Sequence, residues 1–137
     1  MKIIGIGVDI VENKRIRSLI KKKKFLTRTF GKNEILNSKK VKNKMNYFSK
    51  RFASKEALAK AIGTGISEGL NFKDIEVVNN SHGKPYYFNS SKLKNFIIKK
   101  KKIKNFDLFL SISDEKEYSI AITIIQKTDD KKRYNYR

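Results

Sequence analysis

The stretch RFASKEALAKAIGTGI, residues Arg51 to Ile66, has the pattern of a long helix that ends abruptly. Apolar side chains recur every three or four residues through it and just before it, which predicts one amphipathic helix from about Met45 to Ile62. Gly63 stands where a left-handed C-terminal cap would form, and Thr64-Gly65 prevents the helix from continuing. The apolar positions of this helix are Tyr47, Phe48, Phe52, Leu58, Ala61 and Ile62.

The N-terminal segment Lys2 to Ile10 alternates apolar residues with Gly5 and Gly7, which predicts a strand. Glycine inside a strand usually marks a bulge or the close approach of another backbone. Asp9 begins a D-x-x-E sequence, the spacing of a capping box. We therefore expect a helix to open at Asp9 and to run from Val11 to about Ile20.

The remaining predicted elements are short. The basic run at residues 21–24 precedes a short helix over 25–30, and Gly31 with Glu34 three residues later can start another turn of helix. Further on we expect strands over 75–78 and 84–88 around a dense turn, a helix from Ser90 or Ser91 to Lys99, and a hairpin of Phe106–Ser113 and Tyr118–Gln126. This order predicts an α+β fold in which a small antiparallel sheet packs on one long helix and shorter helices.

The length of 137 residues corresponds to one domain, which we assign to residues 1–126, followed by a basic and loose tail over 127–137. The short N-terminal apolar run lacks the features of a signal peptide. No apolar stretch approaches the about 20 residues that cross a bilayer. We therefore expect a cytoplasmic protein that has no membrane partner.

The net charge of +20 favours anionic partners of any kind, because a basic surface accelerates encounters with them. The cations are 27 Lys and only 6 Arg, whereas readout of bases and phosphates favours the bidentate guanidinium group of Arg. Composition alone does not choose among RNA, a small anionic substrate and an acidic protein.

Few residues in the chain are able to do chemistry. There is no Cys, and the single His, His82, lies in a predicted turn, so any catalytic metal must be held by oxygen atoms, which suit magnesium. Asp9 lies at a predicted strand-to-helix turn, and Glu56 lies on the long helix with Lys60 four residues later. Spacing alone favours plainer interpretations, with Asp9 as a helix cap and Glu56 with Lys60 as a helical ion pair.

Three further features have an ordinary structural interpretation when each is taken alone. Arg51 and Lys55 are spaced like a solvated basic face of the long helix. The Gly63-Thr64-Gly65 sequence offers backbone N–H groups to a phosphate, but a helix stop explains it equally well. Gly83-Lys84-Pro85 is an unremarkable turn.

Four segments together resemble the holo-acyl-carrier-protein synthase family in order and spacing. GIGVDIVENKRI, Gly5 to Ile16, is similar to the opening motif G-x-G-x-D-x-x-x-x-x-R-I, and Arg51 to Ile66 is similar to the long-helix signature W/F-A-x-K-E-A-x-x-K-A-x-G-T-G. GKP at Gly83 to Pro85 and the hairpin segment Leu110 to Ile125 follow in the same order as in the family. The first two motifs are highly specific, and the resemblance implies the 4′-phosphopantetheinyl transferase fold.

The resemblance also implies an enzyme that transfers 4′-phosphopantetheine from coenzyme A to a serine of an acyl carrier protein, releases adenosine 3′,5′-bisphosphate and supports fatty acid biosynthesis. Asp9 and Glu56 would bind Mg²⁺ with the pyrophosphate of coenzyme A, Lys60 would stabilise the leaving phosphate, and Arg15 would dock the acidic carrier protein. A homotrimer with each active site at a subunit boundary is implied as well. The residues that would hold the phosphates and the adenosine end are Arg51, Lys60, Gly63, Thr64, Gly65, Lys84 and Pro85.

Two positions depart from the family pattern. Gly31 stands where the family often has threonine, and glycine can also cap a helix there. Asp114 stands where the closing motif often has histidine, so no role of that histidine transfers to this chain. The competing hypotheses are a small basic RNA-binding protein, which leaves Asp9 and Glu56 unexplained, and an interaction module, in which both carboxylates are ordinary caps and pairs. We expect no nucleic-acid partner.

Overall fold

The structure is a computed structural model that describes residues 1–63 and 69–129 of the chain. Its elements are β1 (Lys2–Glu12), α1 (Asn13–Leu19), α2 (Lys23–Thr29), α3 (Lys32–Ser38), α4 (Lys44–Ile62), a 3₁₀ turn η1 (Phe72–Asp74), β2 (Val77–Asn79), β3 (Pro85–Tyr87), α5 (Ser91–Lys101), β4 (Phe106–Asp114) and β5 (Tyr118–Lys127). The predicted α+β class is confirmed. The tail predicted from residue 127 stays a prediction, because residues 130–137 lie outside the described part.

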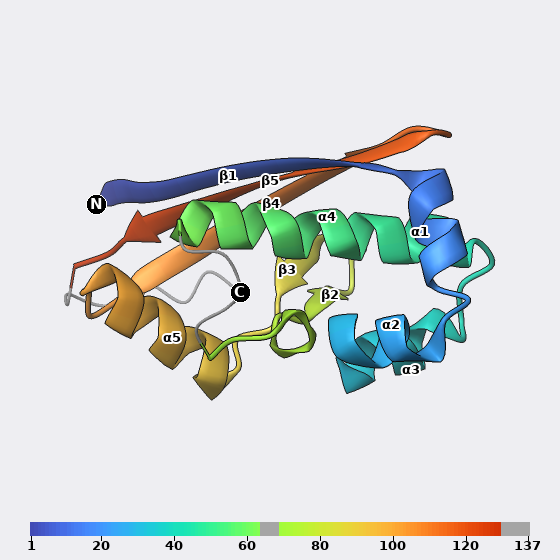
Figure 1. Ribbon diagram of the computed structural model, residues 1–137. Helices are drawn as coiled ribbons and strands as arrows, with labels where there is room; N and C mark the ends of the chain where they lie inside the picture. The colour runs from blue at the N-terminus through green and yellow to red at the C-terminus, as the bar shows by residue number, and fades with distance from the viewer. Residues whose placement is uncertain (64–68, 130–137) are drawn as a thin grey trace.

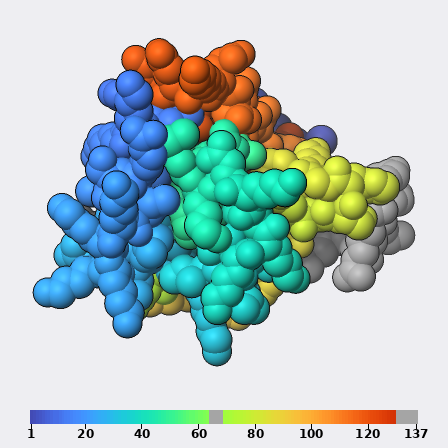
Figure 2. All heavy atoms as spheres, turned by 90° about the vertical axis from the view of Figure 1, so that its right-hand side faces the viewer, coloured from blue at the N-terminus to red at the C-terminus, as the bar shows by residue number. Residues whose placement is uncertain are grey.

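The long helix α4 lies along one face of an antiparallel sheet whose strand order is β1-β5-β4 (Figure 1). A second small sheet, β2-β3, lies on the other side of α4. The helices α1, α2 and α3 gather at the end of the molecule where α4 begins, below the β4–β5 hairpin (Figure 2). Over the described residues, no helix is long and apolar enough to span a membrane.

Two glycines let α4 pack directly on the backbone of β1. A Cβ atom on Gly7 would overlap the carbonyl oxygen of Ala57, and one on Gly5 would overlap the carbonyl oxygen of Ala61. The close backbone approach that glycine in this strand predicted is therefore confirmed. Side chains alternate in a strand, so Asp9 points to the same face of β1 as the two glycines, toward α4.

The opposite face of the three-stranded sheet has no covering layer in the described chain. Ile10 is 62% exposed and Val8 is 50% exposed, which is unusual for large apolar side chains in a small domain. We call this surface the open sheet face; its exposed apolar members include Ile6, Val8, Ile10, Phe109, Ile120 and Ile122.

The predicted helix start at Asp9 is wrong. β1 continues to Glu12, with Asp9 opposite Ala121 and Glu12 opposite Tyr118 of β5, and α1 begins only at Asn13. Glu12, at the N-cap position of α1, makes no side-chain capping bond. Pairing with β5 gives hydrogen-bond partners to the backbone groups that a capping box would have bonded. The long-range strand pairing therefore determines the conformation at Asp9, and the local capping-box spacing does not.

Several local predictions are confirmed by their hydrogen bonds. The N–H of Gly31 donates to Glu34 Oε1 over 3.0 Å at the start of α3. Gly63 ends α4 in the left-handed conformation, with φ of +89°, and its N–H donates to the carbonyl of Ala59. Ser90 rather than Ser91 caps α5. The strand expected from residue 75 begins at Val77, because Ile75 and Glu76 connect the end of η1 to β2.

Candidate functional site

Asp9 and Lys60 meet between β1 and α4. Lys60 Nζ donates to Asp9 Oδ1 and to the carbonyl of Val8, both over 3.1 Å. The glycines of β1 bring the helix close enough for this contact, and Asp9 lies on their face of the strand. The lysine thus bonds across to a strand about fifty residues away in sequence.

Glu56 lies one helical turn before Lys60 and is only partly exposed. Burial, and then the neighbouring charge of Asp9, raise the pKa of Glu56, whereas Lys60 and Arg15 act to lower it. The charge of Asp9 thus acts on Glu56, so the two carboxylates face the same region between β1 and α4. We call Asp9, Glu56 and Lys60 the carboxylate cluster.

Arg15 lies at the edge of this cluster. Its exposed guanidinium is centred 6.0 Å from the centre of the Phe52 ring, and its charge acts on Glu56. Asp9 belongs to β1 and Arg15 to α1, so the two residues do not lie on one helix. The packing of α1 against α4 places Arg15 near Glu56.

A second group of predicted residues surrounds the β2–β3 hairpin. The buried Arg51 stacks its guanidinium 3.6 Å from the Tyr47 ring centre, and its Nη2 donates to Asn79 Oδ1 over 3.5 Å. Asn79 pairs with Pro85 in the hairpin, next to the exposed Lys84. We call Arg51, Lys84 and Pro85 the hairpin cluster. Among the described residues, Arg51 Nε has no hydrogen-bond partner.

The two clusters do not form one site within a single chain. Arg51 and Lys60 are nine residues apart on α4, about two and a half turns, so their side chains leave opposite sides of the helix. Gly63 lies at the C-terminal end of α4, on the side of Glu56. Thr64 and Gly65 lie outside the described residues.

Two other positions have simple roles in the fold. His82 is exposed in the turn before β3, as expected, and its backbone N–H donates to Asn80 Oδ1. Asp114, at the end of β4, accepts a 2.6 Å hydrogen bond from the side-chain amide of Asn46 near the start of α4.

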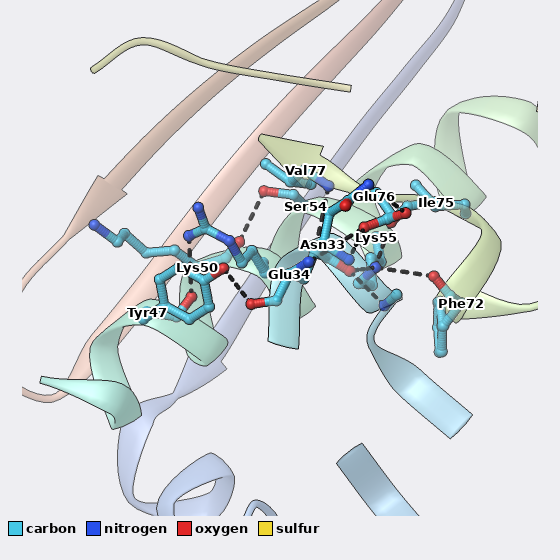
Figure 3. Close-up of polar contacts among 12 residues, drawn as sticks. Asn33, Glu34, Tyr47, Lys50, Ser54, Lys55, Phe72, Ile75, Glu76 and Val77 are labelled. Carbon is cyan, nitrogen blue, oxygen red and sulfur yellow. Dashed lines mark hydrogen bonds and ion pairs between the residues drawn. The ribbon is translucent and has the colours of Figure 1, made fainter. Parts of the chain in front are cut away.

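The solvated basic face predicted for Arg51 and Lys55 is wrong, because both residues are buried. Lys55 is fully buried, and its Nζ donates to Glu34 Oε1 over 2.6 Å, to the carbonyl of Phe72 over 2.9 Å and to the carbonyl of Ile75 (Figure 3). The partners come from α3 and from the segment between α4 and β2, which helical spacing cannot indicate.

The carboxylate of Glu34 has further partners in this network. Its Oε2 accepts from the N–H of Val77, and burial raises the pKa of Glu34 while Lys55 acts to lower it. Glu76 Oε2 accepts from the N–H groups of Asn33 and Glu34 at the start of α3 (Figure 3). The network ties α3, α4 and β2 together, and we regard it as structural.

The donor set for a metal is small. Within residues 1–63 and 69–129, no three His, Asp or Glu side chains cluster as a ready-made cage. Asp9 and Glu56 provide two carboxylates, a set that suits an ion which keeps waters and phosphate oxygens among its ligands.

Comparisons with known proteins show the family of this chain. Residues 5–123 match the sequence profile of the 4′-phosphopantetheinyl transferase superfamily. A holo-[acyl-carrier-protein] synthase of Pelagibacter ubique is 56% identical over 127 residues, which cover 93% of this chain and 99% of that protein. The profile match at residues 5–123 spans Asp9, Glu56 and Lys60.

Solved structures of similar proteins share the fold. The crystal structure of the holo-[acyl-carrier-protein] synthase of Neisseria meningitidis superposes with a TM-score of 0.81 at 37% identity, covering 91% of this chain and 99% of that one. The synthase of Bacillus anthracis, solved in complex with CoA (3′,5′-ADP), gives a TM-score of 0.77 at 35% identity over 93% of this chain and all of that one.

Proposed function

Because this chain belongs to the 4′-phosphopantetheinyl transferase superfamily, we propose that it transfers the 4′-phosphopantetheine group of coenzyme A to a serine of an apo-acyl carrier protein. The products are the holo-carrier protein and adenosine 3′,5′-bisphosphate, and the reaction supports fatty acid biosynthesis. The convergence of Asp9, Glu56 and Lys60 from β1 and α4 is the observation that carries the proposal. The cytoplasmic location expected from the sequence stays a prediction.

The carboxylate cluster fits magnesium. Asp9 and Glu56 offer hard oxygen donors. Burial and then the charge of Asp9 raise the pKa of Glu56, and a bound cation would offset both effects. In this proposal the two carboxylates hold Mg²⁺. The bound ion supplies neutralising charge to the phosphate oxygens of coenzyme A.

The chain's own residues position the reacting groups. The serine oxygen forms a bond to the β-phosphorus of coenzyme A while the bond from that phosphorus to the oxygen bridging the α-phosphate breaks. The proton of the serine hydroxyl passes to a water or a nearby carboxylate, and the leaving group departs as adenosine 3′,5′-bisphosphate. The Lys60 ammonium, held by Asp9 and the carbonyl of Val8, faces the developing charge on the leaving phosphate. Because this reaction depends on positioning and charge, no covalent intermediate with the protein is required.

The separation of the two clusters supports an active site shared between protomers of a homotrimer. Because the two clusters lie on opposite sides of α4, coenzyme A would lie between the carboxylate cluster of one protomer and the hairpin cluster of the next. The open sheet face offers apolar surface for the association. Light scattering should give a mass near three times 16.0 kDa, and a monomer that keeps full activity would rule the trimer out.

A complementation experiment tests the shared site directly. An assembly made only of Glu56→Gln chains, or only of Lys84→Ala chains, is expected to have strongly lowered transfer activity. A mixed assembly of both variants should regain activity, because some of its boundaries combine an intact Glu56 with an intact Lys84. If mixing restores nothing, each active site lies within one chain.

Arg15 is assigned to the carrier protein. It is exposed at the rim of the carboxylate cluster, where its planar guanidinium suits the carboxylates of an acidic helix. Arg15→Ala should raise KM for the carrier protein, leave KM for coenzyme A nearly unchanged, and lose this effect as salt is added. A rise in the coenzyme A constant alone would make Arg15 a phosphate ligand.

One assay tests the whole proposal. The protein is incubated with coenzyme A, Mg²⁺ and apo-carrier protein, and the carrier is weighed by mass spectrometry, with Glu56→Gln as the matched control. The mass of one phosphopantetheine should be added only by the parent. If parent and variant leave the carrier unmodified alike, the proposed function is wrong.

A further inference from the structure

The last turn of α5 is rich in lysine and lies near the C-terminal end of α4 (Figure 1). Lys101 is the residue of this turn that reaches α4. Its Nζ lies 4.0 Å from the position that a Cβ atom would occupy on Gly63, and no other heavy atom of the described chain outside Gly63 and its neighbours comes as close to that position. The missing side chain of Gly63 therefore leaves space open beside the Lys101 ammonium.

The Lys101 ammonium is not engaged by another residue in the described part of the chain. Its side chain is partly buried, and the described residues offer it no hydrogen bond or ion pair. By contrast, Lys92 at the other end of α5 binds Asp74 over 3.0 Å. The Lys101 ammonium is therefore available to an anionic ligand that lies beside Gly63.

Lys101 lies beside Gly63, on the side of α4 that carries Glu56 and Lys60. Gly63 comes seven residues after Glu56, about two helical turns, so both lie on the same side of α4 roughly 10 Å apart along its axis. Lys60 lies between them on the helix and is already engaged by Asp9. A ligand whose pyrophosphate reaches Glu56 and Lys60 can place another anionic group near Lys101.

We propose that Lys101 is a further substrate-binding residue whose ammonium contacts a phosphate of coenzyme A. The inference rests on the proposed function. Both the pyrophosphate and the 3′-phosphate are anions that a lysine point charge binds well. The alternative role is purely structural, in which Lys101 offsets the negative end of the α4 dipole. That role would change stability and leave the affinity for coenzyme A unaltered.

The test compares Lys101→Met with Lys99→Met, which removes the same charge from an exposed position on the same helical turn. Lys101→Met should raise KM for coenzyme A by about 3- to 10-fold, the range of a charge-assisted contact that is partly exposed. Lys99→Met should change it less than about 2-fold, since a distant exposed charge is screened. Circular dichroism and Tm establish that both variants are folded, and calorimetric binding of adenosine 3′,5′-bisphosphate to Lys101→Gln provides a second measurement.

The same variants are assayed with 3′-dephospho-coenzyme A to identify the phosphate. A loss confined to coenzyme A assigns Lys101 to the 3′-phosphate, and an equal loss with both substrates assigns it to the pyrophosphate. An unchanged KM in Lys101→Met, or an equal rise in Lys99→Met, overturns the inference. The parent protein is measured first, because failure of the parent to transfer would refute the proposed function instead.

Discussion

Replacing Lys55 by methionine is the perturbation whose size can be worked out most directly from the structure. Lys55→Met keeps the aliphatic length of the side chain and removes the ammonium. Glu34 then loses its ion-pair partner and keeps two backbone donors, while the carbonyls of Phe72 and Ile75 lose theirs. All these groups surround a side chain with no exposure to solvent, so water cannot replace the lost contacts.

The expected loss is about 3 kcal/mol at pH 7, the lower part of the roughly 3–5 kcal/mol measured when one side of a buried ion pair is removed. The lower value is expected because Glu34 can take up a proton, since burial already raises its pKa. A carboxyl with a raised pKa in the folded state destabilises the fold as pH rises through that pKa. The cost of Lys55→Met should therefore shrink toward pH 4.

Urea unfolding followed by circular dichroism, at one protein concentration, measures the free energy of unfolding. Lys50→Met, on the same helix, is the control and should stay within about 0.5 kcal/mol of the parent. The double variant Glu34→Leu/Lys55→Met should lose less than the sum of its single changes, because no unpaired charge is left buried. A loss below about 1 kcal/mol for Lys55→Met, or additive losses in the double variant, would refute this account of the network.

Three further perturbations have expected outcomes. Gly7→Ala should cost about 1–3 kcal/mol in unfolding and lower transfer more than ten-fold, because the added Cβ pushes α4 away from β1; a fully active, stable variant would show that the close packing is dispensable. Glu56→Gln should abolish transfer yet raise the Tm of the metal-free protein at pH 7.5. The reason is that burial and then Asp9 raise the pKa of Glu56, so its contribution to stability is lost as pH rises. Calorimetry should find this difference shrinking toward pH 4, and a difference that grows there would contradict the sign. Gly31→Thr should destabilise the protein by about 1–2 kcal/mol in urea, because a Cβ at this position would overlap the side chain of Glu76, and an unchanged midpoint would show that Glu76 can move aside.

Local signals in the sequence were sufficient for the elements whose hydrogen bonds stay within a few residues. The span of α4 and its end at Gly63 follow from a 3.6-residue period and one glycine with positive φ. The capping of α3 by Gly31 and Glu34 involves residues three apart. In each case the partners are neighbours in sequence, so spacing alone contains the information.

The conformation at Asp9 required the tertiary structure. Its sequence context satisfies both a strand and a helix cap, and pairing with Ala121, more than one hundred residues away, selects the strand. The same pairing, together with the approach of α4 over Gly7, presents the carboxylate to Lys60. The motif resemblance named Asp9 and Glu56 as partners, but their spatial relation depends on how a strand and a helix pack.

The sequence by itself determined the family motifs, the long helix and the candidate carboxylates Asp9 and Glu56. Only the tertiary structure decided that Lys55 is buried against Glu34 and that Lys60 contacts Asp9 of β1. The physical reason is that a side chain's environment is made by groups remote in sequence. Spacing along a helix fixes the direction in which a side chain leaves it. It does not determine whether that side chain then meets water, a carboxylate or the backbone of another element.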